Sequence, residues 1–233
     1  MSPPLAALLA EARACVHCAQ HLPLGPRPVL RAGASARLMI VGQAPGKKVH
    51  ASGVPWDDAS GRRLRAWLGL APEDFYDASR VAILPTGFCY PGRLPRGGDA
   101  PPRPECAPLW HPRLRAVLPA VELTVLAGSY AQAFYLGSRR ERTLGETVAA
   151  WRRYLPDFLP TPHPSWRVNN WLKQNPWFEA EVVPELQARV TALTALSRIR
   201  PPAGSVAGEE TGTAVAKPIS LSVQYRNGPG PAS

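Results

Sequence analysis

Residues 37–50 read RLMIVGQAPGKKVH, an apolar run that leads directly into a turn rich in glycine and proline. The run 37–41 predicts a buried strand, because it is short, apolar and followed by turn residues. A strand that ends in such a turn brings backbone amides close to a ligand, but this turn matches neither of the familiar glycine-rich nucleotide-binding loops. The stretch therefore predicts a buried strand that carries a binding turn for a ligand of another kind.

The chain around this stretch alternates short apolar runs with segments of helical spacing. Further strands are predicted at 81–84, 121–127 and 158–160, and helices at 5–14, 61–70, 107–118, 129–137, 143–154 and 169–196. The last helix is expected to be interrupted near Pro176 and Pro184, and the turn after the first strand is expected to lead through a loop to the helix at 61–70. This alternation predicts an α/β protein with a parallel sheet covered on both faces and sites at the carboxyl ends of its strands.

The length of 233 residues suits one domain with a full core. We expect this domain to span 1–196 and to be followed by a disordered tail at 197–233, where Gly, Ala, Pro, Ser and Thr dominate and apolar periodicity stops. No window approaches the length of an apolar membrane span, and the first residues lack the pattern of a secretory signal. We expect a cytoplasmic monomer that does not bind membranes.

The net charge of +10 comes largely from arginine. Arginine forms forked contacts with phosphate, so a polyanionic partner is favoured. A compositional bias that raises Arg, Ala and Pro together is the alternative, and the 28 prolines fit it.

The four cysteines occur as one close pair and two distant single residues. Cys15 and Cys18 form a C-x2-C pair, whereas Cys89 and Cys106 flank a loop rich in proline and glycine. A close pair can hold one metal centre from a single turn, and two thiolates from elsewhere would complete four sulfur ligands. Isolated buried thiols and, less readily in a cytoplasmic chain, disulfides are the alternatives. The spacing does not separate zinc from an iron–sulfur cluster. His17, His21 and His111 are further possible ligands, although surface histidines are the commoner case.

Several motifs together resemble the uracil-DNA glycosylase superfamily, and within it the iron–sulfur (thermostable-type) branch. They are VGQAPG at 41–46, GVPWDDASGRRL at 53–64, the order of the cysteines, and PTPHPSWR at 160–167. The branch typically reads G-E-A-P-G, then G-x-P-F-x-G-x-x-G-x-x-L, then the two single cysteines around a Pro-rich loop and a late His-Pro motif. Each motif is weak by itself, but their order and spacing over about residues 12–190 are specific.

The resemblance implies a three-layer α/β/α fold with a central four-stranded parallel sheet. It also implies a [4Fe-4S] cluster on Cys15, Cys18, Cys89 and Cys106, and excision of bases from DNA. An enzyme of this kind must extrude the target base from the helix, because a stacked base cannot be reached. The implied base pocket consists of the first turn, Gly42, Gln43, Ala44, Pro45 and Gly46, together with Trp56, which replaces the usual Phe as a stacking residue.

Two departures from the branch concern its chemistry. Gln43 occupies the position of a Glu, and an amide cannot act as a base although it can pair with a base edge or orient water. Pro85 replaces the usual base-reading Asn after the second strand. Asp57 and Asp58 are the nearest carboxylates, and one of them is expected to position water or stabilise a sugar cation. The same DDASG stretch also suits the capping of a helix.

The late motif supplies the main catalytic candidate, His163, as a hydrogen-bond donor to the departing base. The residues after it imply contacts with DNA: Ser165 with a backbone phosphate, and Trp166 and Arg167 with the space left by the flipped nucleotide. Further phosphate contacts are expected from the basic residues of neighbouring loops, which are Lys47, Lys48, Arg62, Arg63, Arg93 and Arg96.

These motifs lead to two hypotheses of different classes. The first is a monofunctional DNA glycosylase that hydrolyses the N-glycosidic bond of uracil or another deaminated base, without an obvious lysine nucleophile for strand cleavage. The second is a non-catalytic iron–sulfur protein that binds damaged or single-stranded nucleic acid. The departures at Gln43 and Pro85 favour the second, and the His-Pro motif favours the first.

Overall fold

The computed structural model describes residues 4–95 and 97–196. Its centre is a sheet of four parallel strands in the order β2-β1-β3-β4. These strands are β1 (Leu38–Val41), β2 (Val81–Ile83), β3 (Leu123–Ala127) and β4 (Phe158–Thr161). In the middle of the sheet Ile40 pairs with Ile83 on one side and with Val125 on the other. The predicted four-stranded parallel sheet is thereby confirmed.

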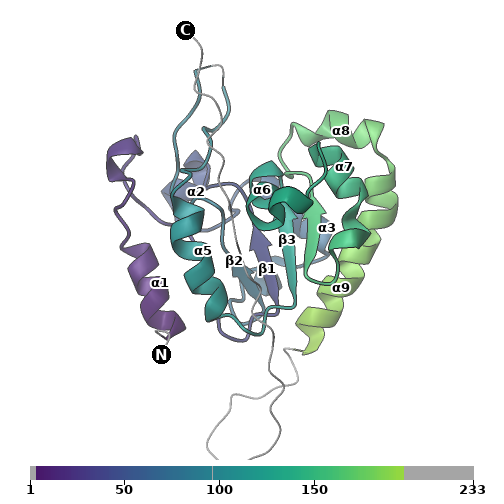
Figure 1. Cartoon of the computed structure of the whole chain (residues 1–233), viewed down its shortest axis with the longest axis horizontal. Coiled ribbons are helices and arrows are strands. Elements are labelled where there is room, and N and C mark those ends of the chain that lie inside the picture. The colour runs from purple at the N-terminus through teal and green to yellow at the C-terminus, as the bar shows by residue number, and fades with distance from the viewer. Residues whose placement is uncertain (1–3, 96, 197–233) are drawn as a thin grey trace, which may run out of the picture.

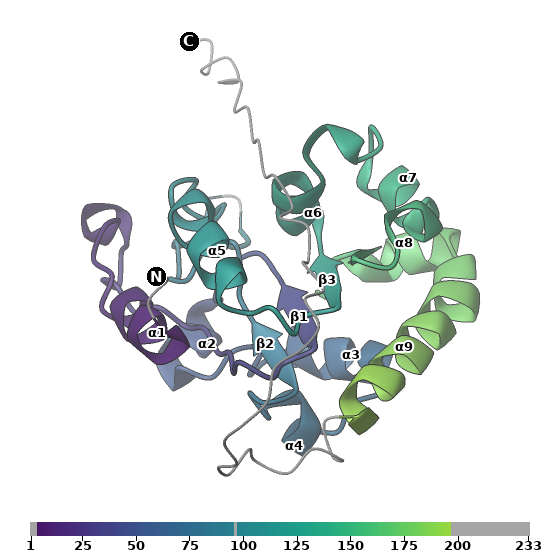
Figure 2. The same cartoon turned by 60° about the horizontal axis from the view of Figure 1, so that its bottom comes forward.

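Helices cover both faces of this sheet, with α1 and α5 on one side and α9 on the other (Figures 1 and 2). The α-helices are α1 (Leu5–Arg13), α2 (Lys47–Ser52), α3 (Ala59–Leu68), α4 (Pro72–Phe75), α5 (Cys106–Ala116), α6 (Ser129–Leu136), α7 (Leu144–Ala149), α8 (Val168–Gln174) and α9 (Val183–Leu196). Single turns of 3-10 helix occur at η1 (Ala19–His21), η2 (Gly137–Arg139) and η3 (Trp151–Tyr154), and a π-helical turn at η4 (Phe178–Val182).

Each face of the sheet has its own hydrophobic core. Met39 and Val41 pack with residues of α1, α5 and α6, whereas Leu38 and Ile40 pack with residues of α3 and α9. Successive side chains of a strand point to opposite faces, so one apolar run supplies both cores. A strand buried on both sides reads as a continuous apolar run, as residues 38–41 do. The predicted three-layer α/β/α fold is confirmed.

The predicted elements differ from the observed ones mainly at short helices. The turn after β1 does not lead into a loop: α2 begins at Lys47, with Gly46 as its N-cap, and ends where Gly53 adopts a left-handed conformation. Six residues are too few to show a helical period in the sequence. The predicted helix at 143–154 divides into α7 and the turn η3, and the expected break near Pro176 separates α8 from η4.

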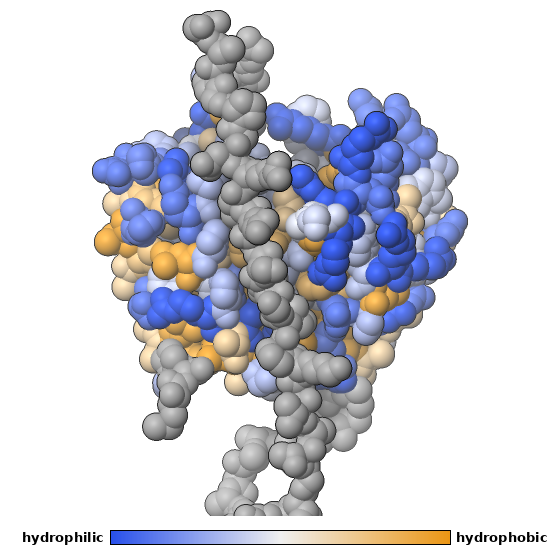
Figure 3. Space-filling model, viewed as in Figure 1, coloured by the Kyte–Doolittle hydropathy of each residue, from blue (hydrophilic) through white to orange (hydrophobic). Residues whose placement is uncertain are grey.

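Parts of the prediction fall outside the described residues, namely the tail at 197–233 and Arg96. Within the described ranges, no helix is both long and apolar enough to cross a membrane. Figure 3 shows one face of the molecule. Hydrophilic residues gather on the side of α7 and α8, and smaller apolar areas are mixed with hydrophilic ones over the rest of this face.

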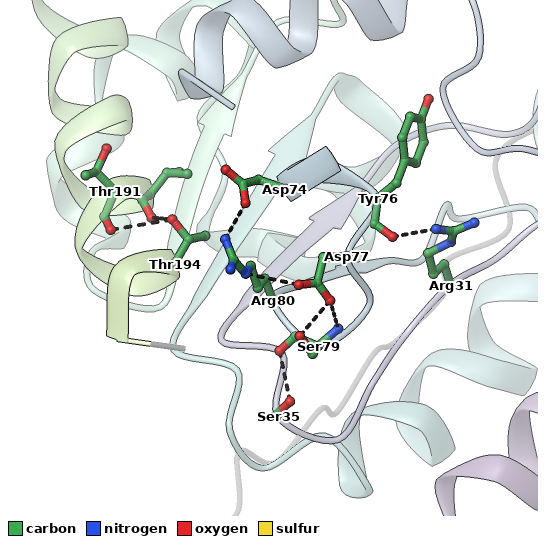
Figure 4. Close-up of polar contacts among 10 residues, drawn as sticks. Arg31, Ser35, Asp74, Tyr76, Asp77, Ser79, Arg80, Thr191 and Thr194 are labelled. Carbon is green, nitrogen blue, oxygen red and sulfur yellow. Dashed lines mark hydrogen bonds and ion pairs between the residues drawn. The ribbon is translucent and has the colours of Figure 1, made fainter. Parts of the chain in front are cut away.

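A polar network joins the loops that precede β1 and β2 (Figure 4). Arg80 forms ion pairs with Asp74 and with Asp77, where its Nε lies 3.0 Å from Oδ2. The Asp77 carboxylate also accepts hydrogen bonds from the backbone N–H and the hydroxyl of Ser79. Burial would raise the pKa of Asp77, but the Ser79 hydrogen bonds and Arg80 outweigh it and hold the pKa below its ordinary value. The network thus fixes the amino-terminal edge of the sheet.

We expect Arg80→Met to lower the free energy of unfolding by about 1–2 kcal/mol, because a mostly buried guanidinium loses two carboxylate partners. Arg140→Met, at an exposed arginine, is the matched control. A depressed carboxyl pKa stabilises the fold above the ordinary Asp pKa and ceases to do so on acidification. Thermal unfolding should therefore show a deficit for Arg80→Met at pH 7 that shrinks near pH 3, and equal melting of the two variants at pH 7 would contradict this account.

Candidate active site

A cleft of about 660 Å³ opens at the carboxyl edge of the sheet. The turns that follow β1, β2 and β4 all contribute to its walls, as expected for a parallel sheet. Most of the predicted site residues line it, namely Gly42, Gln43, Ala44, Pro45, Gly46, Lys47, Trp56, Asp58, Pro85, Arg93, His163, Ser165, Trp166 and Arg167. The structure therefore brings together residues that lie up to 125 positions apart along the chain.

One wall of the cleft is the indole of Trp56, which lies directly against Gly42. A Cβ at Gly42 would stand 2.6 Å from Cζ2 of the indole, so only glycine allows this contact. Trp56 has a backbone φ of 59°, the left-handed region that a bulky residue rarely adopts. Gly61 lies against the backbone of the same residue, since a Cβ there would meet the Trp56 carbonyl oxygen at 1.8 Å. Gly42 thus packs against the indole of Trp56, and Gly61 packs against its backbone.

His163 lies next to this wall, with 5.6 Å between the centroids of its ring and the Trp56 indole. The end of β4 is held in place behind it, because Thr161 O accepts hydrogen bonds from Gly128 N and from Gln132 Nε2. Burial lowers the pKa of His163, and the nearby Asp58 carboxylate opposes this only in part. The imidazole is therefore neutral at pH 7 and can donate a hydrogen bond without carrying a charge.

The two adjacent aspartates have different places. Asp58 lines the cleft and is the N-cap of α3, where its Oδ1 accepts the Gly61 N–H at 2.8 Å. Asp58 therefore fits both interpretations of the DDASG stretch, because its carboxylate caps a helix and the residue also lines the cleft. Asp57 is exposed and does not appear in the cleft wall, and its charge acts on Tyr76 instead.

The two positions that depart from the iron–sulfur branch are both built into the cleft wall. Gln43 Nε2 donates to Ala100 O at 3.3 Å, which ties the first turn to the loop between Cys89 and Cys106. The carbonyl of Pro85 accepts a hydrogen bond from Nε2 of His111 at 3.0 Å. The Pro85 side chain is an apolar ring and offers no polar group to the cleft.

His111 is a buried structural residue and lies neither on the surface nor among the cysteines. Because its Nε2 donates to a carbonyl, its Nδ1 accepts the hydroxyl hydrogen of Tyr135, at 2.8 Å. Burial lowers the pKa of His111 to about 4, with only partial opposition from the Pro85 carbonyl. His17 and His21 are exposed.

Basic residues surround the mouth of the cleft, but they differ in role. Lys47, Arg93 and Arg167 line it, whereas Lys48 and Arg62 are exposed away from it. Arg63, which the sequence suggested as a phosphate contact, donates to Ser165 O at 2.8 Å and to Asn169 Oδ1 at 2.7 Å. It therefore clamps the loop after β4 to helix α3.

The loop after β4 also presents an exposed aromatic residue. The Trp166 side chain is 76% exposed, and the Arg167 guanidinium lies 5.6 Å from its ring centroid. Exposed tryptophan beside arginine is the kind of surface on which nucleic-acid bases stack.

Among the cleft residues that were not predicted from the sequence are Tyr90 and Asp99. Both come from the loop between Cys89 and Cys106, where proline and glycine leave no periodic pattern that would place a side chain. The only available signal was the position of this loop after β2, at the same edge of the sheet as the other turns.

All four cysteines line a second cavity, of about 20 Å³. Burial raises the pKa of the Cys89 thiol to about 11 and that of the Cys106 thiol to about 12. Unless a ligand is bound, both thiols are therefore protonated at neutral pH. Within residues 4–95 and 97–196, however, no group of three or more His, Cys, Asp or Glu side chains forms a ready site for a metal ion. The four cysteines thus line one cavity.

Two of the residues that line this cavity carry an unpaired N–H group. Trp110 Nε1 and Arg103 Nε are buried without a hydrogen-bond partner among the described residues, and both residues line the cysteine cavity. The backbone N–H of Phe88 already donates to Cys106 Sγ at 3.3 Å. Buried donors normally have partners, so these suggest an acceptor inside the cavity.

The fold and cleft define an α/β protein with a cleft of aromatic and basic residues at the carboxyl edge of a parallel sheet. The family model of the Uracil DNA glycosylase superfamily matches residues 31–187, which include every strand of the described residues and all of the cleft lining except Val29. The chain belongs to this superfamily.

The clamp predicts that Arg63→Ala frees the loop at 163–169. Amide hydrogen exchange measured by mass spectrometry should rise in peptides of this loop, because two hydrogen bonds from Arg63 to it are lost. Arg62→Ala, at the exposed neighbouring arginine, should leave that exchange unchanged. Equal exchange in both variants would show that the loop is held by other contacts.

Proposed function

We propose that this protein is a DNA glycosylase that hydrolyses the N-glycosidic bond of uracil or another deaminated base in DNA. The observation that carries the proposal is the pairing of a neutral His163 with the Trp56 wall inside the cleft. Membership in the Uracil DNA glycosylase superfamily supports the same chemistry.

The cleft suits a base that has left the helix. Extrusion is required because the reacting carbon is inaccessible in a stacked duplex, and a flipped base needs an aromatic face and polar groups at its edge. Trp56 supplies the face. The backbone of the Gly42–Gly46 turn and the amide of Gln43 supply polar groups, while Pro85 closes one side without selecting for a particular hydrogen-bond pattern.

The chemistry rests on stabilising charge as the bond breaks. The departing base gains negative charge on a ring oxygen, and a hydrogen bond from His163 placed there lowers the barrier. The sugar gains positive charge, and the Asp58 carboxylate, which acts electrostatically on His163, is placed to balance it. Lys47 is exposed on α2 and lacks the apolar burial that activates an amine nucleophile, so strand cleavage is not part of the proposal.

Contacts to the DNA backbone would come from Lys47, Arg93 and Arg167 at the mouth of the cleft, and from Ser165. Such contacts position the substrate without reading its sequence. Trp166 and Arg167 would fill the space left by the extruded nucleotide, because they are exposed and lie at the same mouth.

The same proposal includes a [4Fe-4S] cluster on Cys15, Cys18, Cys89 and Cys106. The residues fit it: four thiols line one cavity, and two unpaired N–H groups line it too. A tetrahedral zinc ion, with Zn–S bonds of about 2.3 Å, would need the sulfurs gathered around a single point. A cubane binds four cysteines, one at each iron, and four cysteines line this cavity. When bound, the cluster would supply a structural cross-link between the N-terminal turn and the loop after β2.

Oligonucleotides that carry uracil, hypoxanthine or xanthine test the function directly. Single-stranded and duplex forms are incubated with the protein, and alkali-labile abasic sites are counted. Release of at least one of these bases supports the proposal. Tight, salt-dependent binding with no release from any of them would contradict it and would favour a nucleic-acid binding protein without this chemistry.

His163→Ala should lower the single-turnover rate of base release by about 10²- to 10³-fold, because one preorganised donor is removed. Affinity for the same DNA should change little, since the hydrogen bond strengthens only as the bond breaks. His21→Ala, at an exposed histidine that is not part of the cleft wall and lies outside the C-x2-C turn, is the matched control. An unchanged rate for His163→Ala would remove His163 from the mechanism.

Protein purified without oxygen should be brown, with a broad visible absorption shoulder and about four irons per chain. Cys89→Ser should lose iron and melting temperature together, because a ligand of the cluster is missing. Colourless protein with one equivalent of zinc would contradict the cluster and leave the cysteines as a metal site of another kind.

A further inference from the structure

Asp99 reaches the cleft from the loop between Cys89 and Cys106. Its Oδ2 lies 3.3 Å from the point where a Cβ at Gly46 would stand, so its carboxylate is in contact with the turn after β1. The next residue, Ala100, accepts the hydrogen bond from Gln43 Nε2. The loop therefore places a carboxylate beside the turn whose own side chain, Gln43, is an amide.

The other acidic residues near the cleft have different roles. Asp58 holds the first turn of α3 through the Gly61 N–H, and Asp57 is not part of the cleft wall. Gln43 cannot accept a proton at neutral pH. The Asp99 carboxylate lines the cleft and has no hydrogen bond or ion pair among the residues that the structure describes.

The charges around Asp99 distinguish it from Asp58. Partial burial raises the pKa of Asp99, and the Asp58 carboxylate adds to this, while Arg93 and Arg167 oppose it. Lys47, on α2, is the other charged residue of this wall. Two carboxylates in one site whose environments differ commonly divide the acid–base roles between them.

We propose that Asp99 is the catalytic residue that activates water in the reaction proposed above. The inference rests on that proposed function. Asp99 accepts a proton from water as the water oxygen forms a bond to C1′ of the deoxyribose. The C1′–N bond breaks, and its electron pair leaves with the base, which is held by His163. The base then takes up one proton, and Asp99 returns its proton to solvent, so the products are an abasic site and a free base.

The test compares Asp99→Asn, Asp99→Glu and Asp99→Ala in single-turnover base release on the best substrate of the wild-type protein. Asp99→Asn should be about 10²- to 10³-fold slower, and Asp99→Glu should keep much of the rate, because it retains a carboxylate. Sodium formate should partly restore Asp99→Ala, since a small carboxylate can occupy the vacated space. Affinity for the DNA and the melting temperature should stay near the wild-type values, and Glu73→Gln, at an exposed residue of α4, is the control.

The outcomes separate the inference from the function on which it rests. If the wild-type protein releases no base, the proposed function fails and Asp99 loses its role with it. If the wild-type protein is active and Asp99→Asn is equally fast, only the assignment of Asp99 is overturned. If Asp99→Asn is slow but neither Asp99→Glu nor formate with Asp99→Ala recovers the rate, Asp99 is not the base that activates water.

Discussion

The close packing of the Trp56 indole against Gly42 is the contact on which the cleft depends. Because no residue larger than glycine fits against the indole at position 42, the end of β1 and the segment that leads into α3 are held in one relative position. The ring in turn meets His163 from the end of β4, so the carboxyl ends of two strands are joined through one aromatic residue. The unusual backbone conformation of Trp56 belongs to this arrangement, and a strained residue at a site commonly marks function.

The segment 85–90 joins the cleft to the cysteine cavity. Pro85 and Tyr90 line the cleft, whereas Gly87, Phe88 and Cys89 line the cavity. The backbone N–H of Gly87 donates to Gln43 O, so the same segment also contacts the first turn. Anything that cross-links the four cysteines would therefore stiffen one wall of the cleft and both ends of the loop that carries Asp99. This gives the proposed cluster a role in holding the site without taking part in its chemistry.

The sequence predicted the sheet well because each strand is a short apolar run bounded by turn residues, as at 38–41. It also predicted which turns meet, because parallel strands bring their carboxyl ends to one edge. It could not predict α2, whose six residues show no period, or the places of Arg63 and Asp99. The contacts of Arg63 depend on the conformation of a distant loop, and Asp99 lies in a segment of proline and glycine where no pattern fixes side-chain direction. The Asp57–Asp58 pair shows the same limit, since one step along the chain separates a residue of the cleft wall from an exposed one.

The central claim is that the cleft receives a base extruded from DNA, which stacks on Trp56 and accepts a hydrogen bond from His163. A crystal structure with an oligonucleotide that carries a 2′-fluorinated, non-hydrolysable deaminated nucleoside tests it most directly. The account predicts an extruded base stacked on the Trp56 indole, with its ring oxygen within hydrogen-bond distance of the His163 imidazole. A target base still stacked in the DNA, or DNA bound to another face of the protein with the cleft empty, would contradict it.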